Sequence, residues 1–307
     1  MSEILLETKA LTKTYGRHNA VDNINLRIRK GSIYGLIGKN GAGKTTLMRI
    51  LSGMCKPTSG TFEYTGYKGG NNEAFGRTGS LIEMPALMPG LDAYDNLKLK
   101  SIAYGCFDDS VIRETLKLVG LERTQGKKVK GFSLGMRQRL GIALALIGDP
   151  DILFLDEPIN GLDPEGIAEV REILTDLNRE RGITIIISSH ILAELSKLAT
   201  DYAFIDNGRI IEETNREELE AKNRGRLVFV CDDTRKACEI LRMSGHNNIE
   251  VADDKTIYIY EDGDPAPEIN MMLCKEDVLV RSFDYESEDL ERYFLDVVRK
   301  ASGKGVV

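Results

Sequence analysis

A glycine-rich segment at residues 38–45 carries the side chains best suited to chemistry, and it ends in Lys44 and Thr45. Its glycines let consecutive backbone N–H groups turn toward a phosphate. The lysine reaches β- and γ-phosphate oxygens, and the threonine hydroxyl ligates Mg²⁺. The segment therefore predicts an ATP or GTP site. The residues expected to contact the nucleotide are Gly38, Lys39, Asn40, Gly41, Ala42, Gly43, Lys44, Thr45 and Thr46.

Two adjacent carboxylates, Asp156 and Glu157, follow an apolar run at residues 152–155. We expect Asp156 to hold Mg²⁺ through water and Glu157 to polarise the water that attacks the γ-phosphate. A kinase would need only the first carboxylate, whereas transfer to water requires a positioned base. The pair therefore favours hydrolysis. The alternative is an acidic end of a strand before the turn at Pro158.

Strands and helices in the required order surround these groups. The apolar run 33–37 predicts a buried strand before the glycine-rich loop, and the residues from Thr46 onward predict a helix after it. Residues 4–30 alternate in the manner of an edge β-sheet meander, and Pro57–Gly60 predicts a turn into another strand. Further expected elements are strands at 151–155 and 183–188, helices at 133–147 and 165–180, and a helical insertion from 92 to 123.

The pattern restarts after about Gly225 in the order βαββαβ, which predicts a small α+β domain without a catalytic constellation. We expect domains at residues 1–224 and 225–307, with a helical subdomain at about 88–150 inside the first. The expected elements of the second domain are strands at 227–231, 248–260 (a pair) and 278–284, and helices at 234–243, 266–274 and 287–300.

Composition limits the classes of function that the chain can have. A chain of 307 residues with 42% hydrophobic content can bury a substantial core, and its net charge of -7 argues against nucleic acid as the main partner. No uninterrupted apolar run of membrane-spanning length and no secretory leader pattern is present, which indicates a cytoplasmic protein. Five scattered cysteines and the lone His246 give no metal-binding spacing.

The start of the helix at 133–147 resembles the signature of ATP-binding-cassette (ABC) ATPases. That signature is usually Leu-Ser-Gly-Gly-Gln, and this chain keeps Ser133 and Gly135 while substituting Leu134 and Met136. A hydroxyl and free N–H groups at a helix N-terminus can bind a γ-phosphate, and Ser133 can cap its own helix at the same time. In the family, that phosphate belongs to the opposite subunit.

The resemblance extends to three further residues. It implies that Tyr15 stacks on adenine, that Asp163 communicates across the interface between subunits, and that His190 contacts the γ-phosphate and orients water beside Glu157. An edge aromatic that merely packs and a histidine that caps a helix are the alternatives. The implied fold is an α/β, P-loop NTPase ABC-ATPase fold, with a parallel sheet core, an antiparallel β subdomain and a helical subdomain, plus the small C-terminal α+β domain.

One departure from the family pattern narrows the resemblance. Most members carry a metal-contacting glutamine after the strand that follows the nucleotide loop, and here the matching residue is Glu83. A carboxylate keeps the metal-facing oxygen, adds a negative charge and loses an amide donor. This glutamate resembles that of bacitracin- and lantibiotic-type antimicrobial-peptide exporters. An ordinary loop acid is the alternative.

Apolar residues follow Glu83, and they admit two interpretations. They either line a groove for a short helix of a membrane subunit, as the resemblance implies, or pack in a core. These residues are Met84, Leu87, Met88, Leu91 and Tyr94.

The resemblance implies an ATP- and Mg²⁺-dependent ATPase subunit that forms a nucleotide-sandwich homodimer and energises a separate integral membrane permease. The expected location is the cytoplasmic face of the membrane, and the expected cargo is an exported antimicrobial peptide or related amphiphile. The alternative is a soluble ABC-type ATPase that acts on nucleic acid or the ribosome. Such proteins usually carry tandem cassettes or a coiled-coil insertion, which this chain lacks. A nucleotide switch or small-molecule kinase is disfavoured by Glu157, Ser133 and His190 together.

Overall fold

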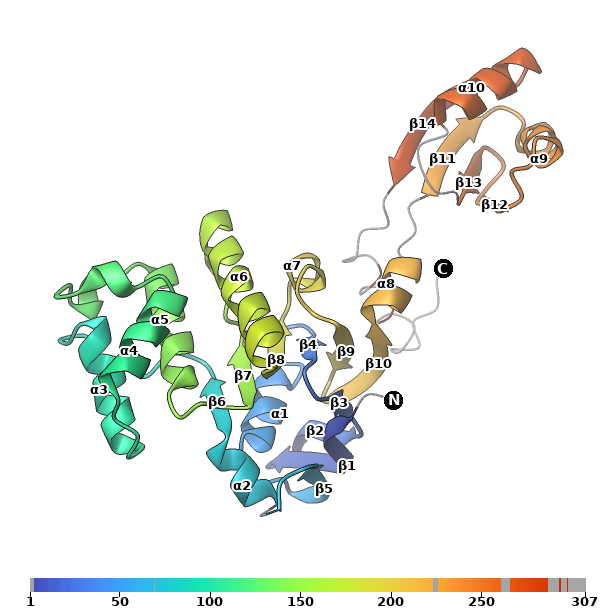
Figure 1. Cartoon of the computed structure of the whole chain (residues 1–307). Coiled ribbons are helices and arrows are strands. Elements are labelled where there is room, and N and C mark those ends of the chain that lie inside the picture. The colour runs from blue at the N-terminus through green and yellow to red at the C-terminus, as the bar shows by residue number, and fades with distance from the viewer. Residues whose placement is uncertain are drawn as a thin grey trace. The chain divides into compact units, whose positions relative to one another are not determined.

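The computed structural model describes residues 3–68, 70–222, 226–260 and 266–286, together with Tyr293 and Val297 (Figure 1). By its internal contacts the chain divides into two compact units, residues 1–216 and 217–307, and each is described by itself. The sequence places a domain boundary eight residues later, after residue 224, and that boundary stays a prediction.

A six-stranded sheet forms the centre of the first unit, in the order β10-β9-β4-β8-β7-β6. Its neighbours pair in parallel except β9 and β10, which are antiparallel. Three of the four inner strands, β4, β7 and β8, are buried throughout, because helices cover both faces of a mainly parallel sheet. The strands are β4 (Ile33–Ile37), β6 (Thr78–Leu81), β7 (Ile152–Asp156), β8 (Thr184–Ser189), β9 (Asp201–Asp206) and β10 (Arg209–Asn215).

A second, antiparallel sheet lies on the other side of helix α1 (Lys44–Leu51). Leu47, Met48 and Ile50 of α1 share one apolar core with residues of both sheets. The antiparallel sheet contains β1 (Ile4–Tyr15), β2 (His18–Ile24), β3 (Arg27–Arg29) and β5 (Ser59–Tyr64).

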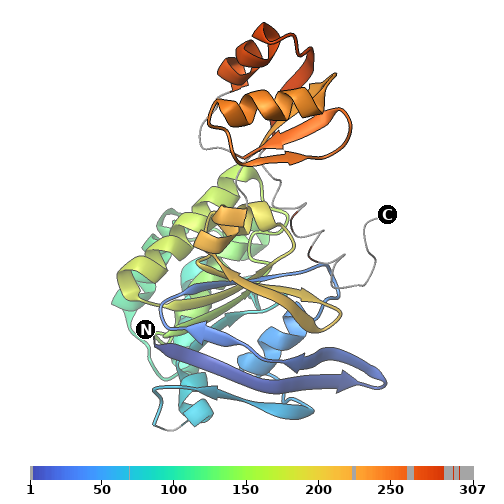
Figure 2. The ribbon, with the colours of Figure 1, turned by 90° about the vertical axis from the view of Figure 1, so that its right-hand side faces the viewer.

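The strands predicted in residues 4–30 are present, but they do not form a simple meander. The long strand β1 is central: its first half pairs with β3 and its second half with β2 (Figure 2). The third strand therefore returns to the first strand rather than adding to the second. A β-bulge between Leu11 and Lys13 accompanies this change of partner, since bulges bend a strand and change its twist.

The opposite face of the parallel sheet is covered by α6 (Pro164–Arg181) and α7 (Leu192–Ser196). The approach of α7 is close: a Cβ at Gly35 would lie 2.6 Å from a methyl carbon of Leu195. A side chain at position 35 would therefore push α7 off the strand that leads into the glycine-rich loop.

The helical insertion predicted from the sequence is present, and it lies to one side of the two sheets (Figure 1). Its N-caps are sequence-encoded: Asp92, Asp108 and Ser133 each accept a hydrogen bond from a backbone N–H of the helix that follows. The insertion consists of α3 (Ala93–Ala103), α4 (Asp109–Leu118), two short 3₁₀ turns (Glu122–Thr124 and Val129–Gly131) and α5 (Leu134–Leu146); α2 (Gly70–Gly76) precedes β6.

The C-terminal unit has the predicted βαββαβ order over its described part. Its antiparallel sheet has the order β12-β13-β11-β14. Helices α9 and α10 pack on one face of this sheet through a core that includes Phe229, Leu241 and Leu273 (Figure 2). The elements are α8 (Arg216–Lys222), β11 (Arg226–Cys231), α9 (Thr234–Met243), β12 (Ile249–Val251), β13 (Thr256–Ile259), α10 (Ala266–Lys275) and β14 (Val280–Glu286). The helix predicted at 287–300 lies outside the described residues, apart from Tyr293 and Val297.

None of the helices in the described residues is long and apolar enough to cross a membrane.

Candidate functional site

The glycine-rich loop joins the end of β4 to the start of α1, as the sequence predicts. Gly41 and Gly43 have φ values of +82° and +111°, in the region that favours glycine. A Cβ at Gly43 would lie 2.3 Å from the carbonyl oxygen of Ala20, so no other residue fits there without moving β2. The loop thereby directs the backbone N–H groups at the start of α1 toward one point, which is the arrangement that binds phosphate.

Lys44 is a buried lysine whose charge is compensated within the site. Its Nζ donates to the carbonyl oxygen of Gly38 at 2.6 Å and lies 3.1 Å from Glu157 Oε1. Only 6% of the side chain is exposed, and a charge this deeply buried requires close partners. Lys39 and Asn40, in contrast, are exposed, so the side chains of the loop contribute unequally.

Thr45 and Asp156 meet across the junction between α1 and β7. Thr45 Oγ1 donates to Asp156 Oδ2 at 2.6 Å, and Ser188 Oγ donates to Asp156 Oδ1, also at 2.6 Å. The Ser188 hydroxyl in turn accepts from the backbone N–H of Glu157 at 2.9 Å. One hydroxyl therefore fixes both consecutive acids.

The sequence analysis did not single out Ser188. Its signal was present, since Ser188 directly follows the apolar run of residues 185–187, and the carboxyl ends of neighbouring parallel strands meet at one edge. β8 pairs with β7 so that Ser188 stands beside Asp156.

Glu157 is held in an uncommon backbone conformation, with φ at +50°. For a residue other than glycine this costs free energy, and such strain collects at functional sites. Its Oε2 lies 2.6 Å from Nδ1 of His190, and its Oε1 faces Lys44. The predicted catalytic residues Lys44, Glu157 and His190 thus form one connected group.

Hard oxygen atoms gather where the sequence predicts Mg²⁺. A magnesium ion takes one or two protein oxygens and completes its octahedron with phosphate and water. The hydroxyl of Thr45 and the carboxylate of Asp156, already in contact with each other, match that donor set. These residues would hold the ion, which would neutralise charge that develops on the transferred phosphoryl group.

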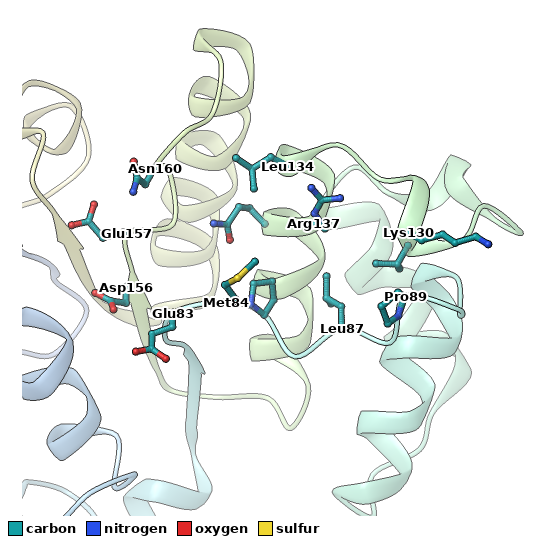
Figure 3. A pocket seen from close by; sticks show the side chains of 13 residues that line it. Glu83, Met84, Leu87, Pro89, Lys130, Leu134, Arg137, Asp156, Glu157 and Asn160 are labelled. Atoms are coloured by element: carbon teal, nitrogen blue, oxygen red, sulfur yellow. The ribbon is translucent and has the colours of Figure 1, made fainter.

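Glu83 bonds to Arg49 rather than to Thr45 or Asp156. It follows β6 with φ at +65°, and its Oε1 accepts a hydrogen bond from Arg49 Nη2 at 2.5 Å. Glu83, Asp156 and Glu157 all line one cavity of about 530 Å³ (Figure 3). The apolar part of its lining comes from the segment after Glu83 and from the helical region: Met84, Pro85, Leu87, Pro89, Val129 and Leu134.

The apolar residues after Glu83 do not form a core. Met84 is 81% exposed and Met88 is 56% exposed, while Leu87, Leu91 and Tyr94 are half-buried. Core packing, one of the two interpretations of this segment, is therefore wrong for the methionines.

Ser133, Gly135 and Asp163 line a separate cleft of about 520 Å³. Ser133 caps α5 by accepting from the N–H of Met136 at 3.2 Å, and Asp163 caps α6 by accepting from the N–H of Gly166 at 3.1 Å. Among the described residues, no hydrogen bond or ion pair joins these three to the glycine-rich loop. Within one chain, the structure does not bring them to the phosphate site.

Tyr15 ends β1 and is 51% exposed, with Lys13 Nζ located 5.3 Å from its ring centroid. Its hairpin partner strand β2 carries Ala20, which touches the glycine-rich loop. Tyr15 is therefore exposed at the turn of a hairpin whose second strand touches the glycine-rich loop.

Comparisons with known proteins agree with this geometry. The family model "ABC transporter" matches residues 21–160. The bacitracin transport ATP-binding protein BcrA of Enterococcus faecalis is 40% identical over 298 residues, which cover 96% of this chain and 97% of BcrA. The lantibiotic transport ATP-binding protein SrtF of Streptococcus pyogenes is 45% identical over 228 residues, covering 73% of this chain and 98% of SrtF.

Solved structures show the same cassette. The chain matches cbiO1 of Clostridium perfringens, part of an ABC transporter complex, with a TM-score of 0.64 and 28% identity over 72% of this chain and 92% of that one. It also matches a dimeric ATP-binding cassette in a post-hydrolysis state with ADP and phosphate, with a TM-score of 0.63 and 26% identity over 69% of this chain and 99% of that one.

Proposed function

Because the chain belongs to the ABC transporter family as an ATP-binding and ATP-hydrolysing subunit, we propose that two copies close around two ATP molecules and drive a separate membrane permease. The observation that carries the proposal is the position of Glu157 between Lys44 and His190. A carboxylate, an ammonium group and an imidazole thus lie together beside the glycine-rich loop, which supports their proposed roles as base, phosphate-binding cation and second proton-carrying group.

Each of these residues has a definite part in the proposed reaction. Lys44 and the N–H groups of the loop bind the β- and γ-phosphates, while Glu157 accepts a proton from the attacking water. His190 contacts the γ-phosphate and, through its 2.6 Å contact, fixes the orientation of Glu157. Thr45 and Asp156 hold Mg²⁺, and Glu83 supplies a further oxygen toward it. Tyr15 stacks on the adenine.

The second copy supplies what one chain leaves unfinished. Ser133 and Gly135 stand at the start of α5, where free N–H groups attract anions, yet they have no phosphate loop beside them in their own chain. In the proposed dimer they close over the γ-phosphate bound by the partner, and Asp163 lies at the interface. ATP then joins the two copies, and its hydrolysis weakens the interface.

The partner in the membrane is proposed to dock beside Glu83. The exposed Met84 lines the cavity that holds Glu83 and Glu157, and the exposed Met88 follows four residues later in the same segment, so both offer adaptable apolar surface. A short helix of a permease seated there would sense the state of the phosphate site directly. The chain would accordingly work at the cytoplasmic face of the membrane.

The cargo is proposed to be a bacitracin-like antimicrobial peptide or a related amphiphile, exported from the cell. The match to BcrA extends over 96% of the chain, whereas the match to SrtF covers 73% of it and nearly all of SrtF. The bacitracin relative therefore shares sequence that the lantibiotic relative lacks. This favours bacitracin-type cargo over lantibiotics.

Glu157→Gln tests the catalytic and dimer proposals together. The amide keeps the size of the side chain but removes the base, so we expect hydrolysis to fall by about 100-fold or more while ATP binding persists. Light scattering should show a monomer without nucleotide and a stable dimer with ATP. If the variant hydrolyses ATP at the parent rate and stays monomeric with ATP, then the role of Glu157 as the base and the nucleotide-sandwich dimer are both wrong.

The cargo proposal needs a test in cells. In the organism that carries the chain, Lys44→Met should lower the bacitracin concentration that stops growth. Lys117→Met, which changes an exposed lysine on α4 that has no proposed role, should leave that concentration within twofold of the parent. If the parent and both variant strains are equally resistant, bacitracin is not the cargo. The assignment of the chain as an ATPase would be unaffected by that result.

A further inference from the structure

Three carboxylates line one cavity, and each has its own compensation within the chain. Asp156 accepts from the hydroxyls of Thr45 and Ser188, as described above. Glu157 faces Lys44, and Glu83 faces Arg49. Figure 3 shows the carboxylates of Glu83 and Asp156 at the same end of the cavity, where a cation would be attracted to both. The charged partner of Glu83, Arg49, is not among the residues proposed to bind phosphate.

Arg49 is placed to affect the metal site without belonging to it. It lies on α1 four residues after Thr45, so the two side chains stand on the same face of the helix, one turn apart. Its Nη2 donates to Glu83 Oε1 at 2.5 Å. The guanidinium therefore binds the Glu83 carboxylate from the same helix that carries the threonine proposed to ligate Mg²⁺.

The pair is loose enough to exchange partners. The side chains of Arg49 and Glu83 are 37% and 61% exposed, and exposed ion pairs contribute little net free energy. A divalent cation that bridges phosphate oxygens can compete with such a guanidinium. Glu83 also has a left-handed backbone, with φ at +65°. This conformation costs free energy for a residue other than glycine and is found most often at functional sites.

We propose that Arg49 is a positioning residue for Glu83: its guanidinium competes with Mg²⁺ for the Glu83 carboxylate and so sets how readily Glu83 engages the metal. The proposal rests on the proposed metal role of Glu83. It also gives a reason for an arginine beside a glutamate at this position, since a neutral glutamine would not form an ion pair. Arg49 acts through Glu83 and does not itself touch the reacting atoms.

The test is a double-mutant cycle of Arg49→Met and Glu83→Gln in the Glu157→Gln background, which keeps ATP intact. The readout is the dissociation constant of Mn²⁺, measured by electron paramagnetic resonance of the free ion in the presence of ATP. Arg49→Met should tighten Mn²⁺ binding by about fivefold, the ratio that an ion pair of this exposure supports. In the Glu83→Gln background the same substitution should change it by less than about twofold.

Two further variants separate positioning from simple changes of charge. Arg137→Met removes a positive charge from the lining of the same cavity without touching Glu83, and it should alter Mn²⁺ binding by less than about twofold. Arg49→Lys keeps the charge and should restore most of the parent value. Thermal unfolding of each variant shows whether α1 remains folded.

The outcomes distinguish the two levels of the argument. If Glu83→Ala, which removes the oxygen that a glutamine would keep, leaves Mn²⁺ binding unchanged, Glu83 is not a metal ligand, and the proposed metal role fails together with the role of Arg49. If Glu83→Ala weakens Mn²⁺ binding but Arg49→Met has the same effect in the parent and Glu83→Gln backgrounds, the metal role of Glu83 stands and the positioning role of Arg49 is overturned.

Discussion

The two halves of the nucleotide site differ in how complete they are within one chain. On the phosphate-loop side, Lys44, Asp156 and Glu157 each have a bonded partner from a different segment of the sequence. On the signature side, Ser133 and Asp163 bond only to the first turns of their own helices. One side is a site that folding completes. The other is a surface that a second copy must complete.

Burial explains why the two sides were built in different ways. Buried charges cannot remain unpaired without a large cost, so Lys44 and Asp156, both about 95% buried, must find partners as the chain folds. At a helix N-terminus on the surface, water and a capping side chain accept hydrogen bonds from the free N–H groups. These groups stay available to bind an anion later. The difference teaches that only one half of this site is completed by contacts within the monomer.

The largest effect is expected from a substitution that changes the signature side and leaves the phosphate-loop side intact. Ser133→Asp keeps a good N-cap for α5 but puts a negative charge where the γ-phosphate of the partner copy is proposed to bind. Repulsion should abolish ATP-dependent dimerisation and reduce hydrolysis by about 100-fold. Light scattering with ATP in the Glu157→Gln background measures the dimer, and phosphate release measures turnover.

The matched control for that substitution is Ser133→Asn. Asparagine is as good a cap as aspartate and nearly the same shape, but it is neutral, so its effect on dimerisation should be several-fold smaller. Binding of ATP to the monomer should be unchanged in both variants. Equal dimerisation of the Asp and Asn variants would mean that no phosphate approaches Ser133.

A smaller effect is expected on the phosphate-loop side from Ser188→Ala. Its hydroxyl holds both the Asp156 carboxylate and the N–H of Glu157, so its loss should lower turnover about tenfold, as loss of a hydrogen bond that orients a metal ligand commonly does. Ser189→Ala is the control, because that hydroxyl bonds only to the backbone of Ile191. If the two alanine variants turn over ATP at the same rate, Ser188 does not position the acids.

The sequence predicted the phosphate-loop side well, because its residues follow one another along strand, loop and helix. Lys44, Thr45, Asp156 and Glu157 could be placed by residue type and order along the chain. The ABC-ATPase fold implied by the resemblance at Ser133, Gly135 and His190 is confirmed. The roles of all these residues, like that of Glu83, stay predictions until tested.

Contacts between distant segments could not be predicted in the same way. The pairing of Arg49 with Glu83 joins positions 34 residues apart, and that of Ser188 with Asp156 joins positions 32 apart. Alternation in residues 4–30 indicated strands, yet their order depends on how α1 fills the space between two sheets. Local periodicity carries no information about that packing.

The smallest effect concerns the opposite end of β7 and tests whether a well-paired carboxylate must be functional. Arg77 donates two hydrogen bonds to Asp151, just before the strand, and these lower the pKa of Asp151. A lowered pKa stabilises the fold above the unfolded value near 4, and this stabilisation disappears as pH falls through the folded value. Both side chains are over 40% exposed, so Arg77→Met should cost less than about 1 kcal/mol at pH 7.

The measurement is the free energy of unfolding of the first unit in urea. The difference in this free energy between parent and variant should shrink from pH 7 to pH 3, while the rate of ATP turnover stays within twofold. A pH-independent difference would assign the loss to packing of the arginine stem, and a tenfold fall in turnover would extend the functional site along the whole of β7.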